Sequence, residues 1–211
     1  MMKAFRITRV VAVTALIMMV SACTIGPTRG EAPRLHLLEW DGSGVEAAAE
    51  RRDAVLLIAT PSASPGHESA AMKYRQQGYE LRQFARNRWA DKPARLIATA
   101  LTEALEDSGQ FRHVAAPGSR VNADYRLDSE LVRLEQLFEN EASGLRLTIR
   151  YRLVDLKTGE VLGSLRQELR ESSESNDPAG GVAAANRALN KGLLALLEAL
   201  PAWLEAATDH D

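Results

Sequence analysis

The 211-residue sequence contains a single cysteine, Cys23, and only four histidines, which are far apart in the chain. One cysteine cannot form an internal disulfide, so a folded domain must rely on its apolar core. No histidine stands at metal-site spacing from another ligand, so we expect no metal and no cofactor. The sequence also lacks the G-x-x-x-x-G-K and G-x-G-x-x-G loops, which argues against nucleotide hydrolysis by this chain.

The longest predominantly apolar run covers residues 10–20, which is too short to span a bilayer comfortably, since a spanning helix needs about 20 apolar residues. Three basic residues and no acidic residue precede it, and Val20-Ser21-Ala22-Cys23 follows. This order resembles the signal peptide and lipobox of bacterial lipoproteins. We therefore predict that residues 1–22 are a signal peptide and that Cys23 is the lipidation site. A signal-anchor helix, or a secretory peptide with a chance cysteine, is the alternative.

Processing would remove three basic residues and leave 23 basic against 28 acidic residues, a net charge of −5. Such a chain does not suggest nucleic-acid binding, which usually requires a basic domain. Residues 23–34 read as a lipidated tether, because they are rich in glycine, proline and charge. Residues 35–207 are predicted to form one domain. Thr24 stands where aspartate tends to retain lipoproteins in the inner membrane of Gram-negative bacteria. By analogy with that class, we expect the inner leaflet of the outer membrane, facing the periplasm.

Strands are predicted from apolar runs and from period-two alternation. The clearest is 145–153, where leucine, isoleucine and tyrosine alternate with arginine and threonine. Residues 124–138 fit a strand or a helical stripe through Leu131, Leu134 and Phe138, and we favour the strand because 145–153 needs a partner. The other predicted strands are 35–40, 54–60 (buried on both faces), two short strands within 72–84, 111–115 and 161–169.

Two amphipathic helices are predicted. The first follows Asp91 as its cap, has Pro93 in its first turn, and ends at Ser108-Gly109. The second begins after Asn176 or Asp177 and continues to about residue 207. The fold class is therefore α+β: a mixed, largely antiparallel sheet with two main helices packed on one face.

Three groups of residues are candidates for a site. Serines near His67 could form a Ser–His pair, although no nucleophile-elbow motif surrounds them. Arg146, Arg150 and Arg152 form a basic row, which we interpret mainly as a solvated face paired with Glu130 and Glu168. The third is the aromatic and arginine-rich stretch 72–89, where core packing is the default interpretation. A partner surface there is the sharper hypothesis, and its residues are Tyr74, Tyr79, Arg88 and Trp89.

The order of these features resembles the ABC-type transport auxiliary lipoprotein family, which includes membrane-integrity lipoproteins that work with MCE (mammalian cell entry) proteins. The resemblance covers residues 35–205 and includes AVLLIATP, MKYRQQGYELRQFARNRWADKP, ARLIATALTEALEDSGQF and LRLTIRYRLVDLKTGEVLGSL. Arg88-Trp89 is its most specific element. It implies a non-enzymatic component of a phospholipid transport system that docks the periplasmic part at the outer membrane.

The partners implied by this resemblance are an MCE-type periplasmic protein and an ABC permease and ATPase, with a homo-oligomer also plausible. Two other functions stay open. One is a general envelope scaffold, for example a regulator of peptidoglycan synthesis or of assembly. The other is a hydrolase that uses a serine and His67.

Overall fold

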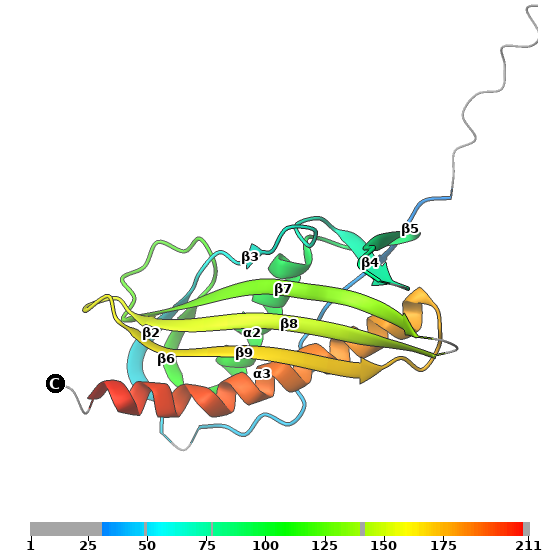
Figure 1. Cartoon of the computed structure of the whole chain (residues 1–211). Helices are drawn as coiled ribbons and strands as arrows, with labels where there is room; N and C mark the ends of the chain where they lie inside the picture. The colour runs from blue at the N-terminus through cyan, green and yellow to red at the C-terminus, as the bar shows by residue number, and fades with distance from the viewer. Residues whose placement is uncertain (1–30, 49, 77, 140–141, 209–211) are drawn as a thin grey trace, which may run out of the picture. The chain divides into compact units, whose positions relative to one another are not determined.

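A nine-stranded mixed sheet carries two helices on one of its faces (Figure 1), as the α+β class predicts. The structure, a computed structural model, describes residues 31–208 apart from 49, 77, 140 and 141, with side chains to residue 205. Residues 33–211 cluster as one unit and residues 1–32 as another, so every element described below lies in the first of these. The helices are α2 (Pro93–Ser108) and α3 (Pro178–Thr208). The strands are β1 (Arg34–His36), β2 (Arg52–Ile58), β3 (Ser62–Ala63), β4 (Ala71–Arg75), β5 (Arg82–Trp89), β6 (Phe111–Ala115), β7 (Tyr125–Glu139), β8 (Ala142–Asp155) and β9 (Val161–Ser172).

Strand β7 is the common partner of the sheet. It pairs antiparallel with β8 along its whole length, and β8 pairs antiparallel with β9. On its other side β7 pairs in parallel with β2, β3 and β4 in turn. Strand β2 also pairs in parallel with β6, so it is enclosed on both sides. The predicted buried strand is present, since Leu56 and Ile58 are fully buried, but it runs from Arg52 to Ile58 rather than over 54–60.

A bulge in β7 explains why residues 124–138 fit two patterns. The pairing register with β8 shifts between Leu131 and Arg133, so Val132 is an extra residue. Such a residue reverses the phase of the side-chain alternation. Leu131 and Leu134 are both buried although they are three positions apart. The segment is a strand, as we favoured, and the apparent helical stripe arises from the bulge.

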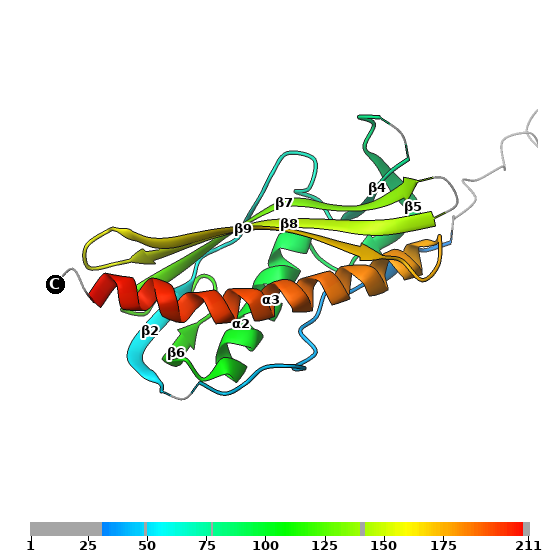
Figure 2. The same cartoon turned by 60° about the horizontal axis from the view of Figure 1, so that its bottom comes forward.

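The core lies between the sheet and the two helices (Figure 2). Alternate residues of β8 are buried from Leu145 to Leu153, as predicted, and they face the buried leucines of α3. Gly163 on β9 lets α3 approach closely, because a Cβ there would lie 2.2 Å from the Trp203 indole. Asp177 caps the start of α3, because its carboxylate accepts a hydrogen bond from the Gly180 amide at 2.8 Å.

Two other predictions at the ends of elements are wrong for identifiable reasons. Strand β1 has three residues rather than six, because residues 37–40 leave the sheet; the Asn186 side chain on α3 bonds the Leu37 carbonyl and the Glu39 amide. Helix α2 is capped by Lys92 without a side-chain hydrogen bond. Asp91 instead accepts from the Lys92 amide at 2.7 Å and forms an ion pair with Arg95. Its other end is as predicted, with Gly109 at φ +64°.

Candidate functional site on the outer face of the sheet

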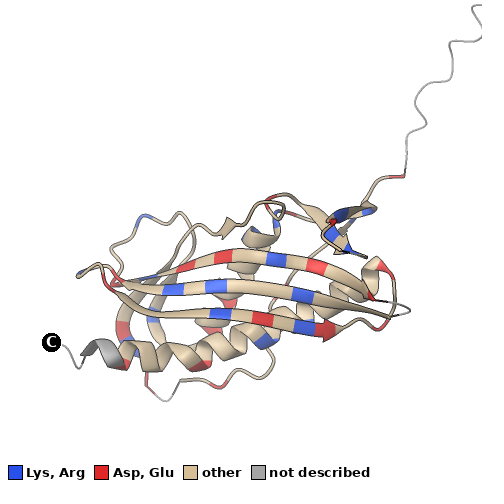
Figure 3. Ribbon diagram, viewed as in Figure 1, with Lys and Arg blue, Asp and Glu red and all other residues tan. Residues whose placement is uncertain are grey.

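Charged residues recur along β7, β8 and β9 (Figure 3), and most of their side chains lie on the face of these strands opposite the helices. Alternation places these residues there, because the neighbours of each one point into the core. β8 contributes only basic charges between its ends, at Arg146, Arg150 and Arg152. The set has seven arginines and five carboxylates: Arg126, Arg133, Arg146, Arg150, Arg152, Arg166 and Arg170 against Asp128, Glu130, Glu135, Glu139 and Glu168. This surface, which we call the outer face, is therefore positive by two charges.

Ion pairs use part of this charge. Arg150 pairs with Glu130, as the sequence suggested, but Arg146 pairs with Glu135 rather than with Glu168. Glu168 lies beside Arg170 at 3.0 Å, and that hydrogen bond holds the pKa of its carboxyl below the usual value. Within the described residues, Arg133 and Arg152 have no carboxylate within 4.0 Å. The outer face thus keeps free positive charge for an acidic partner.

Glu135 is the one carboxylate of the outer face that is fully buried, with a side-chain exposure of 0%. It binds Arg75 of β4 at 3.2 Å and Arg146 of β8, whose side chains are 28% and 15% exposed. Its place follows from the registers, which set Lys73 and Arg146 opposite it on the neighbouring strands. A buried carboxylate is compatible with folding when charged donors surround it. This triad joins the central strands β7 and β8 to β4.

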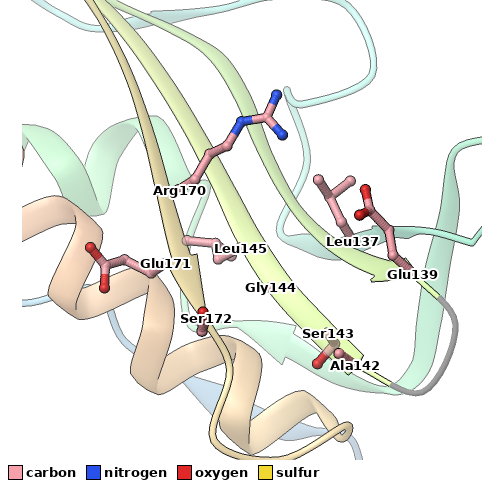
Figure 4. A pocket seen from close by; sticks show the side chains of 9 residues that line it. All are labelled: Leu137, Glu139, Ala142, Ser143, Gly144, Leu145, Arg170, Glu171 and Ser172. Carbon is pink, nitrogen blue, oxygen red and sulfur yellow. The ribbon is translucent and has the colours of Figure 1, made fainter.

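Beside the triad, the ends of β7, β8 and β9 form a cavity of about 250 Å³ (Figure 4). Gly144 leaves the space, while Leu137, Glu139 and Arg170 project on one side of the strands. Ligand pockets for small molecules usually measure about 300–1,000 Å³ and enclose most of the ligand. The volume of this cavity is below that range, so the cavity is better suited to a surface contact than to enclosing a small molecule.

The serines near His67 do not form the Ser–His pair that the sequence left open. Ser64 donates its hydroxyl to Glu130 at 2.8 Å, and Ser62 donates to the Ser129 carbonyl. The Ser69 hydroxyl accepts from the Ala71 amide. Burial lowers the pKa of His67, which is 8% exposed, so its ring is neutral at neutral pH. Across the described ranges, no group of three His, Cys, Asp or Glu residues is arranged to hold a metal ion.

The four residues of the predicted partner surface do not share one surface. Trp89 is 3% exposed and belongs to the core, which corrects its assignment to a surface. Tyr74 packs in an aromatic cluster with Phe84 and Phe138, at ring distances of 4.6 and 5.7 Å. Tyr79 is fully exposed in the β4–β5 turn, and Arg88 is exposed on β5. Strand alternation separates Arg88 from Trp89, because successive side chains point to opposite faces.

Sequence reasoning missed Glu135 and Arg75. The signal was present, since Glu135 lies at a polar position of β7, but its partners depend on strand registers that the sequence does not reveal. Cys23 lies outside the described residues. In the part of the chain that is described, no helix is both long and apolar enough to cross a membrane.

Comparison with known proteins identifies the family. The sequence model of the ABC-type transport auxiliary lipoprotein component matches residues 36–193. The chain belongs to this family. No match is found among curated proteins. A crystal structure of protein XCC0632 from Xanthomonas campestris, of the DUF330 family, is similar at 22% identity and a TM-score of 0.71, covering 84% of this chain and 97% of that one.

A second crystal structure, of an uncharacterized protein, is similar at 10% identity and a TM-score of 0.65, covering 81% of this chain and 99% of that one. At these identities the two structures show a shared fold. Membership of the auxiliary lipoprotein family gives the coarse role, which is a membrane-associated accessory part of an ABC-type transport system.

Proposed function

We propose that this protein is a non-enzymatic outer-membrane lipoprotein that serves an MCE-type phospholipid transport system. It would dock the periplasmic part of that system at the outer membrane, with Cys23 as its anchor. The family match over residues 36–193 carries this proposal. Thr24 after the cysteine supports the outer-membrane address, because no aspartate is present to retain the lipoprotein at the inner membrane.

The outer face is the surface that we propose for the partner. It has two more arginines than carboxylates, in a mature chain whose predicted net charge is −5. A positive face on a protein of negative net charge orients an approaching acidic surface and increases the rate of association. The exposed side chains of Arg150 and Arg152 lie on β8, the middle strand of that face, where a partner would remove them from water. Binding should therefore weaken as salt concentration rises.

A non-enzymatic role is supported by how the polar groups are used. The hydroxyls of Ser62 and Ser64 are bonded to β7, and the His67 ring is buried. Glu135 is engaged by two arginines, so it is not free to act as a base. These residues hold the fold together in positions where an enzyme would need them exposed to substrate.

Site-specific photocrosslinking in cells tests the proposal. A photoreactive residue would replace Arg152 on the outer face, and a matched variant would carry it at Glu198, an exposed position of α3. We expect an MCE-type protein to be captured from position 152 and not from position 198. Capture of unrelated envelope proteins alone, with no MCE-type protein from either position, would contradict the proposed function. Capture of cell-wall synthases would favour the envelope-scaffold alternative.

A further inference from the structure

Two leucines are exposed where the chain enters the sheet. Leu35 in β1 is 64% exposed and Leu37, two residues later, is 46% exposed. Leu38 is 4% exposed, so the segment turns one side to the core and leaves the two leucines on the other. A single exposed leucine needs no explanation, but a neighbouring pair next to basic residues marks a candidate binding surface.

Two arginines lie next to this pair. The registered partner of Leu35 is Arg88 on β5, so these two side chains share a face, whereas Arg34 starts on the opposite face and borders the pair at the end of the strand. Both arginine side chains are exposed, and neither has a carboxylate within 4.0 Å among the described residues. Strands β1 and β5 together contain four arginines and no acidic residue. We call Arg34, Leu35, Leu37 and Arg88 the entry patch.

The anchor lies a short way along the chain from the entry patch. Ten residues separate Cys23 from Arg34, and an extended chain covers at most about 3.5 Å per residue. An anchored chain therefore holds Arg34 within about 40 Å of the membrane surface. This confinement raises the effective concentration of the membrane near the patch, so contacts that are too weak to form from free solution can form.

We propose that the entry patch is a membrane-contact surface, which sets the β1–β5 edge of the domain against a bilayer containing anionic phospholipids. The inference rests on the proposed function only for the anchor at Cys23. The chemistry of the patch fits this occupant: leucines enter the headgroup region while arginines contact phosphate groups. A membrane is favoured over a second copy of the chain for two reasons. The tether leads directly into the patch, and two copies that met there would bring two basic patches together, which repel each other.

Vesicle cosedimentation of the mature chain with Cys23→Ser tests the patch without the anchor. The probe vesicles contain phosphatidylethanolamine and about one quarter phosphatidylglycerol, and the reference vesicles are phosphatidylcholine. We expect binding to the anionic vesicles with a partition constant on the order of 10³ M⁻¹, below the about 10⁴ M⁻¹ of a single myristoyl chain. Binding to the neutral vesicles should be about tenfold weaker.

Two double variants separate the two contributions. Arg34→Gln with Arg88→Gln should weaken binding about tenfold at low salt and match the parent chain at high salt. Leu35→Ser with Leu37→Ser should weaken it about tenfold at both salt concentrations. The matched controls, Arg120→Gln in the loop between β6 and β7 and Val161→Ser on β9, should bind as the parent does; Arg120 is exposed, and Val161 is 55% exposed.

Failure of the parent chain to bind anionic vesicles would overturn the inference, as would equal losses in the control variants. If the patch instead holds two copies of the chain together, sedimentation velocity would show that the leucine variant becomes monomeric while its vesicle binding is unchanged. That result would also overturn the inference. The assay contains no transport protein. Its failure is therefore separate from a failure to capture an MCE-type protein, and each proposal can be rejected alone.

Discussion

Replacement of Glu135 by glutamine should destabilise the domain far more than an equivalent change elsewhere on the outer face. The Glu135 side chain is 0% exposed and contacts Arg75 and Arg146, which are 28% and 15% exposed. Glutamine keeps the size and one acceptor oxygen but removes the negative charge. Two guanidinium groups then stay partly buried without a counter-charge.

The magnitude follows from two opposing contributions. Unit charges about 4 Å apart attract by about 4 kcal/mol at an effective dielectric constant of about 20, and Glu135 makes two such contacts. Desolvation of the three groups offsets most of this attraction, and breaking a buried pair usually costs about 3–5 kcal/mol. Both arginines retain some contact with water and glutamine still accepts a hydrogen bond, so we expect a loss of about 3 kcal/mol. For a domain of this size that lowers Tm by roughly 6–12 °C.

Urea denaturation followed by circular dichroism measures this loss. The matched control is Glu130→Gln, which removes the charge that pairs with the 45% exposed Arg150 on the same face. A surface pair of this kind contributes about 0–1 kcal/mol, and that contribution should disappear at high salt. The Glu135→Gln loss should persist at high salt. A loss below about 1 kcal/mol for Glu135→Gln, or one equal to the control, would refute the assignment of the triad as a buried ion-pair network.

Three further changes have defined outcomes. Gly163→Ala should lower the free energy of unfolding by about 1–3 kcal/mol, because its Cβ would lie 2.2 Å from the Trp203 ring; a second change, Trp203→Leu, should make the alanine less harmful. The pKa of His67 is lowered in the folded protein, so its contribution to stability is complete above pH about 6.5 and is lost as pH falls from there through the folded pKa. His67→Phe should flatten the stability curve over that interval, and an unchanged curve would show that His67 does not titrate there. Cys23→Ser should abolish lipid attachment, which mass spectrometry of the purified protein detects, and should release the chain from the membrane fraction.

The sequence predicted elements well where a pattern is local. The alternation in β8, the apolar run in β2 and the glycine after α2 depend on neighbouring residues alone, and all three are confirmed. Errors arose where a distant residue decides the outcome. Strand β1 stops after His36 because residues 37–40 bond to α3, about 150 positions later in the chain.

The site shows the same limit. Arg88 and Trp89 form one sequence feature, yet strand geometry sends them to opposite sides, and the core takes the tryptophan. The pairing of Arg146 with Glu135 requires knowledge of the bulge at Val132, which no residue type signals. Insertion of β2 between β6 and β7 is likewise a property of the whole sheet. The sequence therefore predicts which side chains face outward better than it predicts which of those side chains contact one another.

The position of β7 also determines when the parts of this chain can acquire structure. A ribosome makes β2, β3 and β4 before β7, and each of these three strands needs β7 as a neighbour. The meander of β7, β8 and β9 with α3, by contrast, is contiguous in sequence and can close its contacts locally. The amino-terminal third thus stays incomplete until more than half of the chain has emerged, and its apolar strand β2 has at most β6 as a neighbour before then. That interval is when the protein is most exposed to aggregation and most in need of a chaperone.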